Sequence, residues 1–557
     1  MREEMIMKKT IVIMVTALAL VSCNKFLDMT PTDRVSVKTM WESTQNAEYS
    51  INYLYTYIWD LNANPTVIGL TESLTDEMKY TSYNYNALCY IPSEMAYGGS
   101  VLTAGYVDSY MGYWGTLYTA IREVNEAISA LNTYGQMNDE DKARLKGELR
   151  YLRGYLYFEL VKRYKDVIIY DENLQAITKD RALDTEEEAW DFISKDLHYA
   201  AENLPSRAGS DGRLNDAVAY ATITRAMLYA KRYDEVIAAA DAIVDMGYEL
   251  EDDYADAVTK TLAQGNNETI FQYTFDYQSG ITHSFDYYYT PGGDYTLIDS
   301  KGGAYGVPTQ EMVESYELET GGFPDWAPWH TTSGTTAEPP YEQLEPRFAA
   351  TILYNGATWK GRDIEPYVGG TDGWATWKTD KEPKGKTVTG YYLRKHVDEN
   401  YDVTTSGGSN PFIFIRLAEV LLNQAEAYVK CNTPDEGKAN DIVREIRDRV
   451  DLPYTNKSGS ALWEAIKQER KVELAFEGLR YWDLRRWGDS SKDYPEGLAN
   501  YQQHGLKITK TGEETYLYQY VTVDEKDRTF AEKLYRFPMP ESELNSNKLV
   551  DQYPEWK

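Results

Sequence analysis

Apolar residues recur every three or four positions along much of this 557-residue chain, and this spacing constrains the fold more than any other feature. The pattern dominates residues 41–247. It is clearest in two runs, which are Trp114, Leu117, Ile121, Val124, Ile128 and Leu131, then Leu145, Leu149, Leu152, Leu156 and Leu160. A period of about 3.6 residues places such side chains on one face of an α-helix. We therefore predict a mostly α-helical protein.

The predicted helices are arranged in pairs. Two of them, at 217–230 and 234–245, are similar to a tetratricopeptide unit. An earlier helix is expected to begin at a cap formed by Asp184 or Thr185. Helical spacing returns at 416–430, 435–450 and 461–479. Stacked helix pairs form a curved framework, so we predict a tetratricopeptide-like helical repeat scaffold.

The composition of the chain changes at about residue 265. Residues 266–410 hold 18 of the 38 glycines, 9 of the 20 prolines and 5 of the 13 tryptophans, and helical periodicity disappears there. A shorter stretch at about 61–110 is rich in Tyr, Asn and Ser and also lacks helix signals. Both stretches are predicted to be irregular, loop-rich insertions carried by the helical scaffold.

These patterns divide the chain into six segments. They are a signal peptide (1–22), a lipidated tether (23–40), a helical scaffold (41–265, with the insertion at about 61–110), a loop-rich insertion (266–410), a second scaffold part (411–488) and an irregular C-terminal segment (489–557).

The N-terminal segment indicates where the protein works. Residues 7–23 read MKKTIVIMVTALALVSC, in which the apolar run 11–21 is too short to span a bilayer and is typical of a secretory signal. The small residue Ser22 directly before Cys23 resembles the end of a bacterial lipobox. That resemblance implies cleavage before Cys23 and lipidation of its thiol, which would anchor the protein at a membrane surface outside the cytoplasm.

Charge and cysteine content exclude several classes of partner and fold. The formal net charge is −31, so phosphate backbones would be repelled and we expect no nucleic acid partner. With Cys23 lipidated, only Cys89 and Cys431 remain, which allows one disulfide at most and excludes a disulfide scaffold.

Motifs for metal, cofactor and nucleophilic chemistry are missing from the sequence. It contains no Cys-x-x-Cys, no His-x-x-x-His, no EF-hand loop, no Gly-x-Ser-x-Gly elbow and no phosphate-cradling loop. We therefore expect no metal, no cofactor and no catalytic residue.

One buried carboxylate is predicted in the C-terminal half of the scaffold. Glu469 lies on the apolar stripe of the predicted helix at 461–479. It could be a catalytic acid with a raised pKa or one half of a structural ion pair with Arg416, Arg470 or Arg480. The charge-rich helical context favours the structural ion pair.

The segment around Glu469 also carries a family resemblance. Residues 469–487 read ERKVELAFEGLRYWDLRRW and resemble the signature of the SusD-like (RagB/SusD) lipoproteins of the Bacteroidetes outer membrane. Matching stretches follow the same order along the chain, at CNKFLD (23–28), GELRYLRG (147–154), RLAEV (416–420) and FPMP (537–540). The resemblance implies a fold with four tetratricopeptide-like units. It also implies a non-catalytic glycan-binding protein that faces the cell exterior and serves a SusC-like, TonB-dependent transporter.

The two insertions contain the residue types that bind sugars. Aromatic rings stack on the C–H faces of sugars, and polar side chains bond to the hydroxyl edges. Asp76 and Glu77 in the first insertion and Asp294 in the second are available for such edges. We predict a shallow platform for a neutral oligo- or polysaccharide, formed by Trp326 and Trp329 as leading residues, then Tyr83, Tyr85, Tyr288 and Tyr289.

Two other functions remain open from the sequence. A surface glycoside hydrolase needs two carboxylates about 5–9 Å apart beside a sugar cleft, and 88 acidic residues do not exclude such a pair. A helical-repeat scaffold for protein partners would use its concave helix face, but it would not need long Tyr- and Trp-rich insertions.

Overall fold

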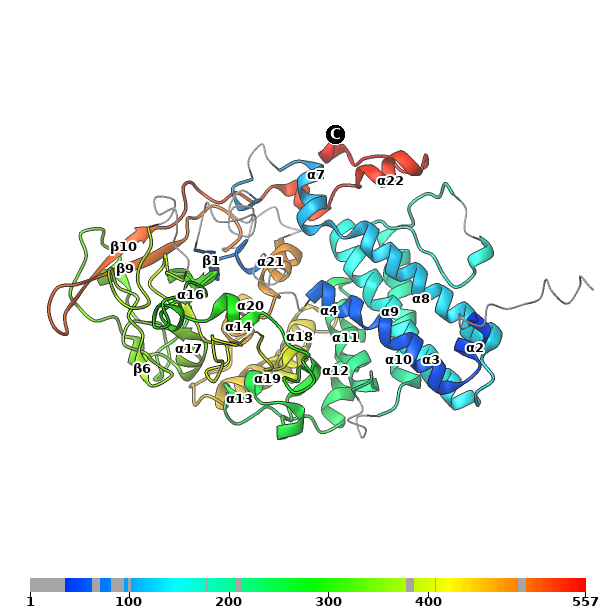
Figure 1. Cartoon of the computed structure of the whole chain (residues 1–557), viewed down its shortest axis with the longest axis horizontal. Helices are drawn as coiled ribbons and strands as arrows, with labels where there is room; N and C mark the ends of the chain where they lie inside the picture. The colour runs from blue at the N-terminus through cyan, green and yellow to red at the C-terminus, as the bar shows by residue number, and fades with distance from the viewer. Residues whose placement is uncertain are drawn as a thin grey trace, which may run out of the picture.

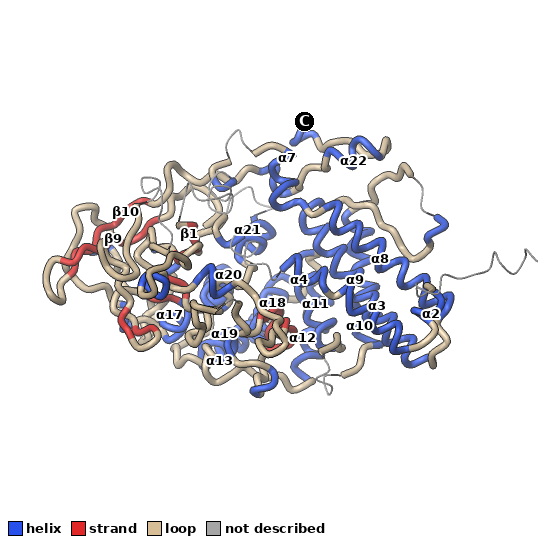
Figure 2. The backbone as a smooth tube through the Cα atoms, in the orientation of Figure 1, coloured by secondary structure: helices blue, strands red, loops and turns tan. Residues whose placement is uncertain are grey.

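The computed structural model describes residues 36–62, 71–81, 95–98, 102–176, 179–206, 212–376, 385–405, 407–488 and 497–557. Long helices gather in one half of the molecule, whereas short strands, short helices and loops make up the other half (Figures 1 and 2). The predicted mostly helical, tetratricopeptide-like fold with insertions is confirmed.

The first part of the scaffold contains the predicted long helices. Its helices are α2 (Val37–Trp41), α3 (Thr44–Leu54), α4 (Thr56–Asn62), α8 (Trp114–Tyr134), α9 (Asp139–Tyr164), α10 (Glu186–Asn203), α11 (Asp216–Tyr229) and α12 (Tyr233–Asp245). Every residue of the two predicted apolar runs is buried. Thr185 caps α10 in a capping box with Glu188, which resolves the predicted choice of cap. Helices α11 and α12 form the predicted pair.

The second part of the scaffold follows the insertion. Its helices are α18 (Leu417–Lys430), α19 (Glu436–Asp448), α20 (Gly459–Glu473) and α21 (Arg480–Gly488). The prediction of one helix at 461–479 is wrong at its end, because α20 stops at Glu473. Phe476 and Gly478 have positive φ angles of 61° and 78°, which an α-helix does not accommodate. The chain therefore turns before α21 begins.

The insertions and their borders contain many short elements. The helices are α7 (Ala104–Val107), α13 (Asp256–Thr259), α14 (Phe285–Tyr289), α15 (Gly293–Thr296), α16 (Gln310–Val313) and α17 (Pro346–Thr351). The strands are β1 (Met78–Tyr80), β2 (Thr269–Tyr273), β3 (Gly306–Pro308), β4 (Ile352–Leu353), β5 (Thr358–Trp359), β6 (Arg362–Asp363), β7 (Tyr392–Leu393) and β8 (Phe412–Arg416). Single helical turns are η1 (Asp108–Gly112), η2 (Leu174–Ala176), η3 (Leu262–Gln264), η4 (Ala327–Trp329) and η5 (Tyr341–Gln343).

Two antiparallel strand pairs hold the insertions in place. Strands β2 and β8 lie at the two ends of the long insertion and pair with each other, with Thr269 opposite Arg416. The long insertion therefore leaves and re-enters the scaffold through one ladder. Strand β1 of the first insertion pairs with β3 of the second, with Met78 opposite Pro308. The β1–β3 pair thus holds the two insertions together, although the paired strands are more than 200 residues apart in the sequence.

The C-terminal segment is more ordered than predicted. It contains β9 (His504–Lys510), β10 (Tyr516–Thr522), η6 (Glu532–Tyr535), α22 (Glu541–Ser546) and η7 (Pro554–Trp556). Strands β9 and β10 form an antiparallel hairpin at the end of the molecule far from α8 and α10 (Figure 1). The expectation of a wholly irregular segment is therefore wrong. The end of the chain returns to the scaffold, where Phe537 donates its backbone N–H to the carbonyl oxygen of Arg163 at 2.8 Å.

Two large apolar cores correspond to the two halves. The larger core fills the space between the scaffold helices. The second lies inside the insertion, where Trp359, Phe348, Tyr391 and Tyr392 are fully buried. It also includes Phe476, which follows α20, so the insertion core rests on the second part of the scaffold.

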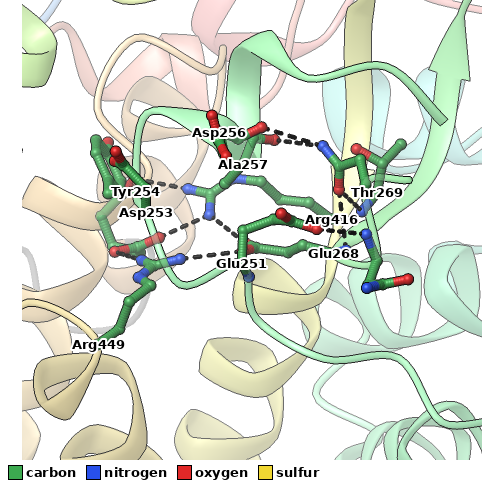
Figure 3. Close-up of polar contacts among 12 residues, drawn as sticks. Glu251, Asp253, Tyr254, Asp256, Ala257, Glu268, Thr269, Arg416 and Arg449 are labelled. Carbon is green, nitrogen blue, oxygen red and sulfur yellow. Dashed lines mark hydrogen bonds and ion pairs between the residues drawn. The ribbon is translucent and has the colours of Figure 1, made fainter. Parts of the chain in front are cut away.

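A buried charge cluster joins the halves. Its members are Glu268, Arg347, Arg416, Arg449, Glu469, Glu473 and Glu477. Arg416 at the end of β8 bonds Glu268 at 2.6 Å, and Arg449 bonds Glu268 at 3.0 Å (Figure 3). Arg416 also bonds Glu473 at 2.6 Å. Burial would raise the pKa of Glu477, but Arg416 and Lys395 lower it to about 2. Glu477 is thus ionised within the cluster.

Glu469 belongs to this cluster. It forms ion pairs with Arg347 on α17 and with Arg447 on α19, the latter at 3.1 Å. The predicted structural ion pair is confirmed, but the suggested partners are wrong. Arg470 bonds Asp483, Arg480 bonds Asp76, and Arg416 bonds other members of the cluster.

Replacing Arg416 should destabilise the fold far more than replacing a surface arginine. Arg416→Met leaves three buried carboxylates with fewer cations, so we expect the free energy of unfolding to fall by about 3–5 kcal/mol. The matched control is Arg444→Met, because Arg444 pairs with Asp441 at the surface and should cost less than about 1 kcal/mol. Urea denaturation followed by Trp fluorescence measures both. Equal losses in the two variants would contradict the role given to Arg416.

Candidate functional site

Of the two leading predicted stacking residues, Trp326 lies in the insertion core, and Trp329 lies between that core and the β9–β10 hairpin. Trp326 is 6% exposed and packs against the edge of Trp329, with ring centroids 5.6 Å apart. The expected exposure of Trp326 is therefore wrong. Trp329 is half-buried and donates its indole N–H to the carbonyl oxygen of Ala337 at 2.9 Å. These two rings are engaged in packing.

The β9–β10 hairpin explains why Trp329 is covered, whereas Trp326 belongs to the insertion core itself. One face of the hairpin carries Leu506, Ile508 and Tyr518 and packs against Trp329. Thr335, which follows the tryptophans, pairs with Tyr518 as an antiparallel bridge. The loop that carries Trp329 and Thr335 is predicted to be exposed, but it is held between the insertion core and the β9–β10 hairpin.

Several predicted residues of the first insertion cannot be placed at a site. Tyr83 and Tyr85 lie outside the described residues, as do Cys23 and Cys89. The described acidic residues Asp76 and Glu77 are both buried.

Asp76 and Glu77 therefore do not offer their carboxylates to sugar hydroxyls. Asp76 bonds Lys471 at 2.6 Å and Arg480 at 3.0 Å. Burial opposes its ionisation, but Arg480 and Lys471 lower the pKa of Asp76 below its usual range. Asp76 is thus a structural partner of α20 and α21, and its predicted role at a sugar edge is wrong.

The tyrosines of α14 divide between the core and the surface. Tyr289 is 2% exposed and stacks on Phe285, four residues earlier, at a centroid distance of 4.5 Å. The prediction that Tyr289 is an exposed platform residue is therefore wrong. Tyr288 is half-buried and Tyr287 is 39% exposed. Residues i and i+4 share a helix face, so the spacing of Phe285 and Tyr289 was a signal that Tyr287 lies on the opposite face.

We define the tyrosine surface as Tyr287, Tyr288 and Tyr305. The ring centroids of Tyr287 and Tyr288 are 5.3 Å apart, and those of Tyr288 and Tyr305 are 4.7 Å apart. Leu297 and Ile298, which follow α15 in the sequence, are 64% and 45% exposed. The ring planes are inclined at 77° and 58°, so the three rings form a contiguous aromatic cluster and not one flat face.

Backbone hydrogen bonds hold the tyrosine surface in position. The N–H of Tyr305 donates to the carbonyl oxygen of Tyr288 at 2.9 Å, and the N–H of Gly303 donates to that of Tyr287 at 3.2 Å. Gly303 has a φ angle of 71°, and a Cβ there would lie 2.1 Å from the carbonyl oxygen of Thr290. Glycine is therefore required for the close approach of the two segments. These hydrogen bonds thus fix the backbone of Tyr287 and Tyr288 relative to that of Tyr305.

Asp294, on α15, is a buried carboxylate of the same insertion. Its carboxylate accepts from Arg362 at 2.8 Å, from the indole N–H of Trp359 at 3.1 Å and from Lys360 at 3.0 Å. Burial opposes its ionisation, but Arg362, Trp359 and Lys360 together lower the pKa of Asp294. The carboxylate is therefore fully used, and the expectation that it bonds sugar hydroxyls is wrong.

The chemistry that the tyrosine surface offers is stacking and hydroxyl hydrogen bonding. Within the described ranges no hydrogen bond engages the hydroxyl group of Tyr287 or Tyr288, so each is available as donor and acceptor. In the same part of the chain no group of three or more His, Cys, Asp or Glu side chains is placed to hold a metal ion. No described helix combines the length and apolarity needed to cross a bilayer.

Two family models match the sequence. The model described as the SusD family matches residues 267–556. The model described as starch-binding associating with outer membrane matches residues 25–228. The first covers the long insertion and the second part of the scaffold, and the second covers most of the first part.

Individual proteins are similar over nearly the whole chain. A SusD-like protein of Bacteroides ovatus is 23% identical over 560 residues, which cover 98% of this chain and 95% of that protein. The crystal structure of a SusD-like protein from Bacteroides fragilis has a TM-score of 0.77 at 26% identity and covers 94% of this chain and 99% of its own. A SusD-like carbohydrate binding protein, also from Bacteroides fragilis, has a TM-score of 0.74 at 22% identity and covers 92% and 100%. These structures share the fold described above.

Proposed function

This chain belongs to the SusD family, and we propose that it is a cell-surface lipoprotein that binds a saccharide chain at the tyrosine surface and delivers it to a TonB-dependent outer-membrane transporter. The SusD family is a family of non-catalytic binding proteins. Association with the outer membrane is part of the description of the family model that matches residues 25–228.

The observation that carries this proposal is the arrangement of Tyr287, Tyr288 and Tyr305. Sugar rings have apolar C–H faces that stack on aromatic rings, and their hydroxyls exchange hydrogen bonds with groups such as the tyrosine hydroxyl. Main-chain hydrogen bonds hold these tyrosines in place before a ligand arrives, which lowers the entropic cost of binding. An open surface of this kind suits a long chain better than a small enclosed ligand.

Two features of the sequence support delivery to a transporter. The lipobox-like sequence ending at Cys23 would anchor the protein at the membrane, although Cys23 lies outside the described residues. The family resemblance implies a SusC-like partner. With a net charge of −31, the protein body would be repelled by anionic surfaces, so a lipid anchor supplies attachment that the charged body does not.

The alternative functions have less support. A glycoside hydrolase would need two accessible carboxylates at the sugar site. Asp286 and Asp294, on either side of Tyr287 in the sequence, are both buried, and Asp294 is held by cations. A scaffold that binds only protein partners would leave the exposed tyrosines of the insertion without a role.

Replacing Tyr287 or Tyr288 should abolish most saccharide binding without unfolding the protein. Starch and a panel of other neutral polysaccharides serve as ligands in affinity gels, followed by calorimetry with whichever binds. Truncating an aromatic anchor typically costs about 2 kcal/mol, so we expect affinity to fall about 30-fold in Tyr287→Ala.

Two variants control this experiment. Tyr277→Ala removes a tyrosine that is 52% exposed but outside the tyrosine surface, and it should bind normally. Trp326→Ala creates a cavity in the core and should lower the melting temperature. Wild-type affinity in both Tyr287→Ala and Tyr288→Ala would show that the site lies elsewhere.

The anchor and the transporter are tested together in native membranes. Cys23→Ala should move the protein from the membrane fraction to the soluble fraction in cells that lack the transporter, with an unchanged melting temperature. Mild detergent extraction of wild type should yield a complex with a TonB-dependent transporter, and a stable one should bury more than about 2,000 Å². A monomer across several detergents, or sedimentation of Cys23→Ala with membranes, would contradict the respective part of the proposal.

A further inference from the structure

A narrow crevice lies where α9, α11, β8 and α21 meet, and none of its lining residues belongs to the tyrosine surface. Its volume is about 60 Å³. Three cationic side chains line it together with several aromatic rings: Lys162, Arg163 and Arg225, with Phe158, Phe412 and Trp482. Two carboxylates, Glu159 and Glu477, line it as well, and Arg225 is paired with Glu419.

The three cations are largely buried, yet some of their donors are unused. The side chains of Lys162, Arg163 and Arg225 are 9%, 4% and 12% exposed. Lys162 donates to Glu159 at 2.7 Å, and Arg225 donates to Glu419 and to the carbonyl oxygen of Phe414. Across the described ranges no acceptor contacts Nη2 of Arg163, Nη1 of Arg225 or the other two ammonium hydrogens of Lys162.

The two carboxylates that line the crevice are already engaged by cations. One carboxylate oxygen of Glu159 accepts from Lys162 and the other from Arg163, at 2.7 and 2.5 Å. Glu477 accepts from Arg416 and Lys395. Neither carboxylate therefore pairs with the unused donors of Lys162, Arg163 and Arg225. A ligand with acceptor oxygens and negative charge would pair with these donors.

The electrostatics of Lys162 point in the same direction. Burial lowers the pKa of Lys162 to about 7, opposed by attraction to Glu159 and aided by repulsion from Arg163 and Arg225. Glu477 is the other carboxylate that lines the crevice. At neutral pH the ammonium group is thus close to losing its proton. A bound anion would favour the charged form and would raise this pKa.

The shape of the crevice limits what enters it. One water needs about 10–15 Å³ of such space, so 60 Å³ admits a carboxylate with a few waters and excludes a sugar ring. Phe412 and Phe414 also line the crevice and are half-buried, with ring centroids 5.2 Å apart. A sugar ring that directs its carboxylate into the crevice would therefore contact Phe412 and Phe414.

We propose that this crevice binds the carboxylate of an acidic sugar, a uronic acid residue, with its ring against Phe412 and Phe414 and its oxygens on Lys162, Arg163 and Arg225. The proposal rests on the proposed function only in taking a saccharide as the ligand, and it places a second site apart from the tyrosine surface. It also changes the expected ligand class, because a chain with uronic acid residues is anionic whereas a neutral polysaccharide was predicted.

Calorimetry with matched small ligands tests the proposal. The ligands are glucuronate, its neutral methyl ester and acetate, each titrated at pH 7 into the full mature protein in two buffers of different ionisation enthalpy. We expect glucuronate to bind with proton uptake and the ester and acetate to bind at least tenfold more weakly. Equal affinity for the ester would show that the crevice does not recognise the carboxylate, and equal affinity for acetate would show that it does not recognise the sugar ring. Either result would overturn the proposal.

Variants of Lys162 test whether this side chain is responsible for glucuronate binding and proton uptake. Lys162→Met should lower glucuronate affinity at least tenfold and abolish proton uptake, whereas the control Lys467→Met, which breaks a surface pair with Glu464, should change neither. Lys162→Arg keeps the charge without a titratable ammonium, so it should bind glucuronate without proton uptake even if Lys162→Met does not fold. Uptake that persists in Lys162→Arg would overturn the proposal. Tyr287→Ala should bind glucuronate normally, which separates failure of this site from failure of the tyrosine surface.

Discussion

Arg416 lies fully buried where strand β8 meets α18, and it contacts carboxylates from three places in the chain. Glu268 comes from the start of the insertion, Glu473 from the end of α20, and Glu477 from the turn that follows it. Each of these groups would be strongly unfavourable alone in the interior, and together they form ion pairs. The cluster therefore requires both ends of the insertion and the second part of the scaffold to be in place at once.

The functional surface depends on this junction through the main chain. The β2–β8 ladder begins at the charge cluster, and the segment that follows β2 leads to α14 and the tyrosine surface. Backbone hydrogen bonds from Gly303 and Tyr305 then position the tyrosines, and the β1–β3 pair connects this region to the first insertion. The scaffold thus acts as a rigid base for a binding surface that has few regular elements of its own.

Local pattern was sufficient to predict the scaffold, and long-range contacts decided the site. The apolar runs of α8 and α9 determine their buried faces, and the position of Glu469 on such a face was enough to predict an ion pair. The Gly- and Pro-rich neighbours of Trp326 predict that its side chain lies at the surface. It is buried in the insertion core together with residues as distant in the sequence as Tyr391 and Phe476, which no local signal links to it. Tyr287 could have been found, because the i, i+4 spacing of Phe285 and Tyr289 leaves it on the outer face.

Hydrogen–deuterium exchange of Arg416→Met tests most directly whether the charge cluster holds the binding surface in place. Peptides that cover residues 269–308 should lose protection under native conditions, because the β2–β8 ladder and the segments that carry the tyrosine surface depend on the cluster. Peptides from α8, α9 and α10 should keep wild-type protection, since these helices are stabilised by their own core. Unchanged protection at 269–308, or an equal loss across both halves, would contradict the account.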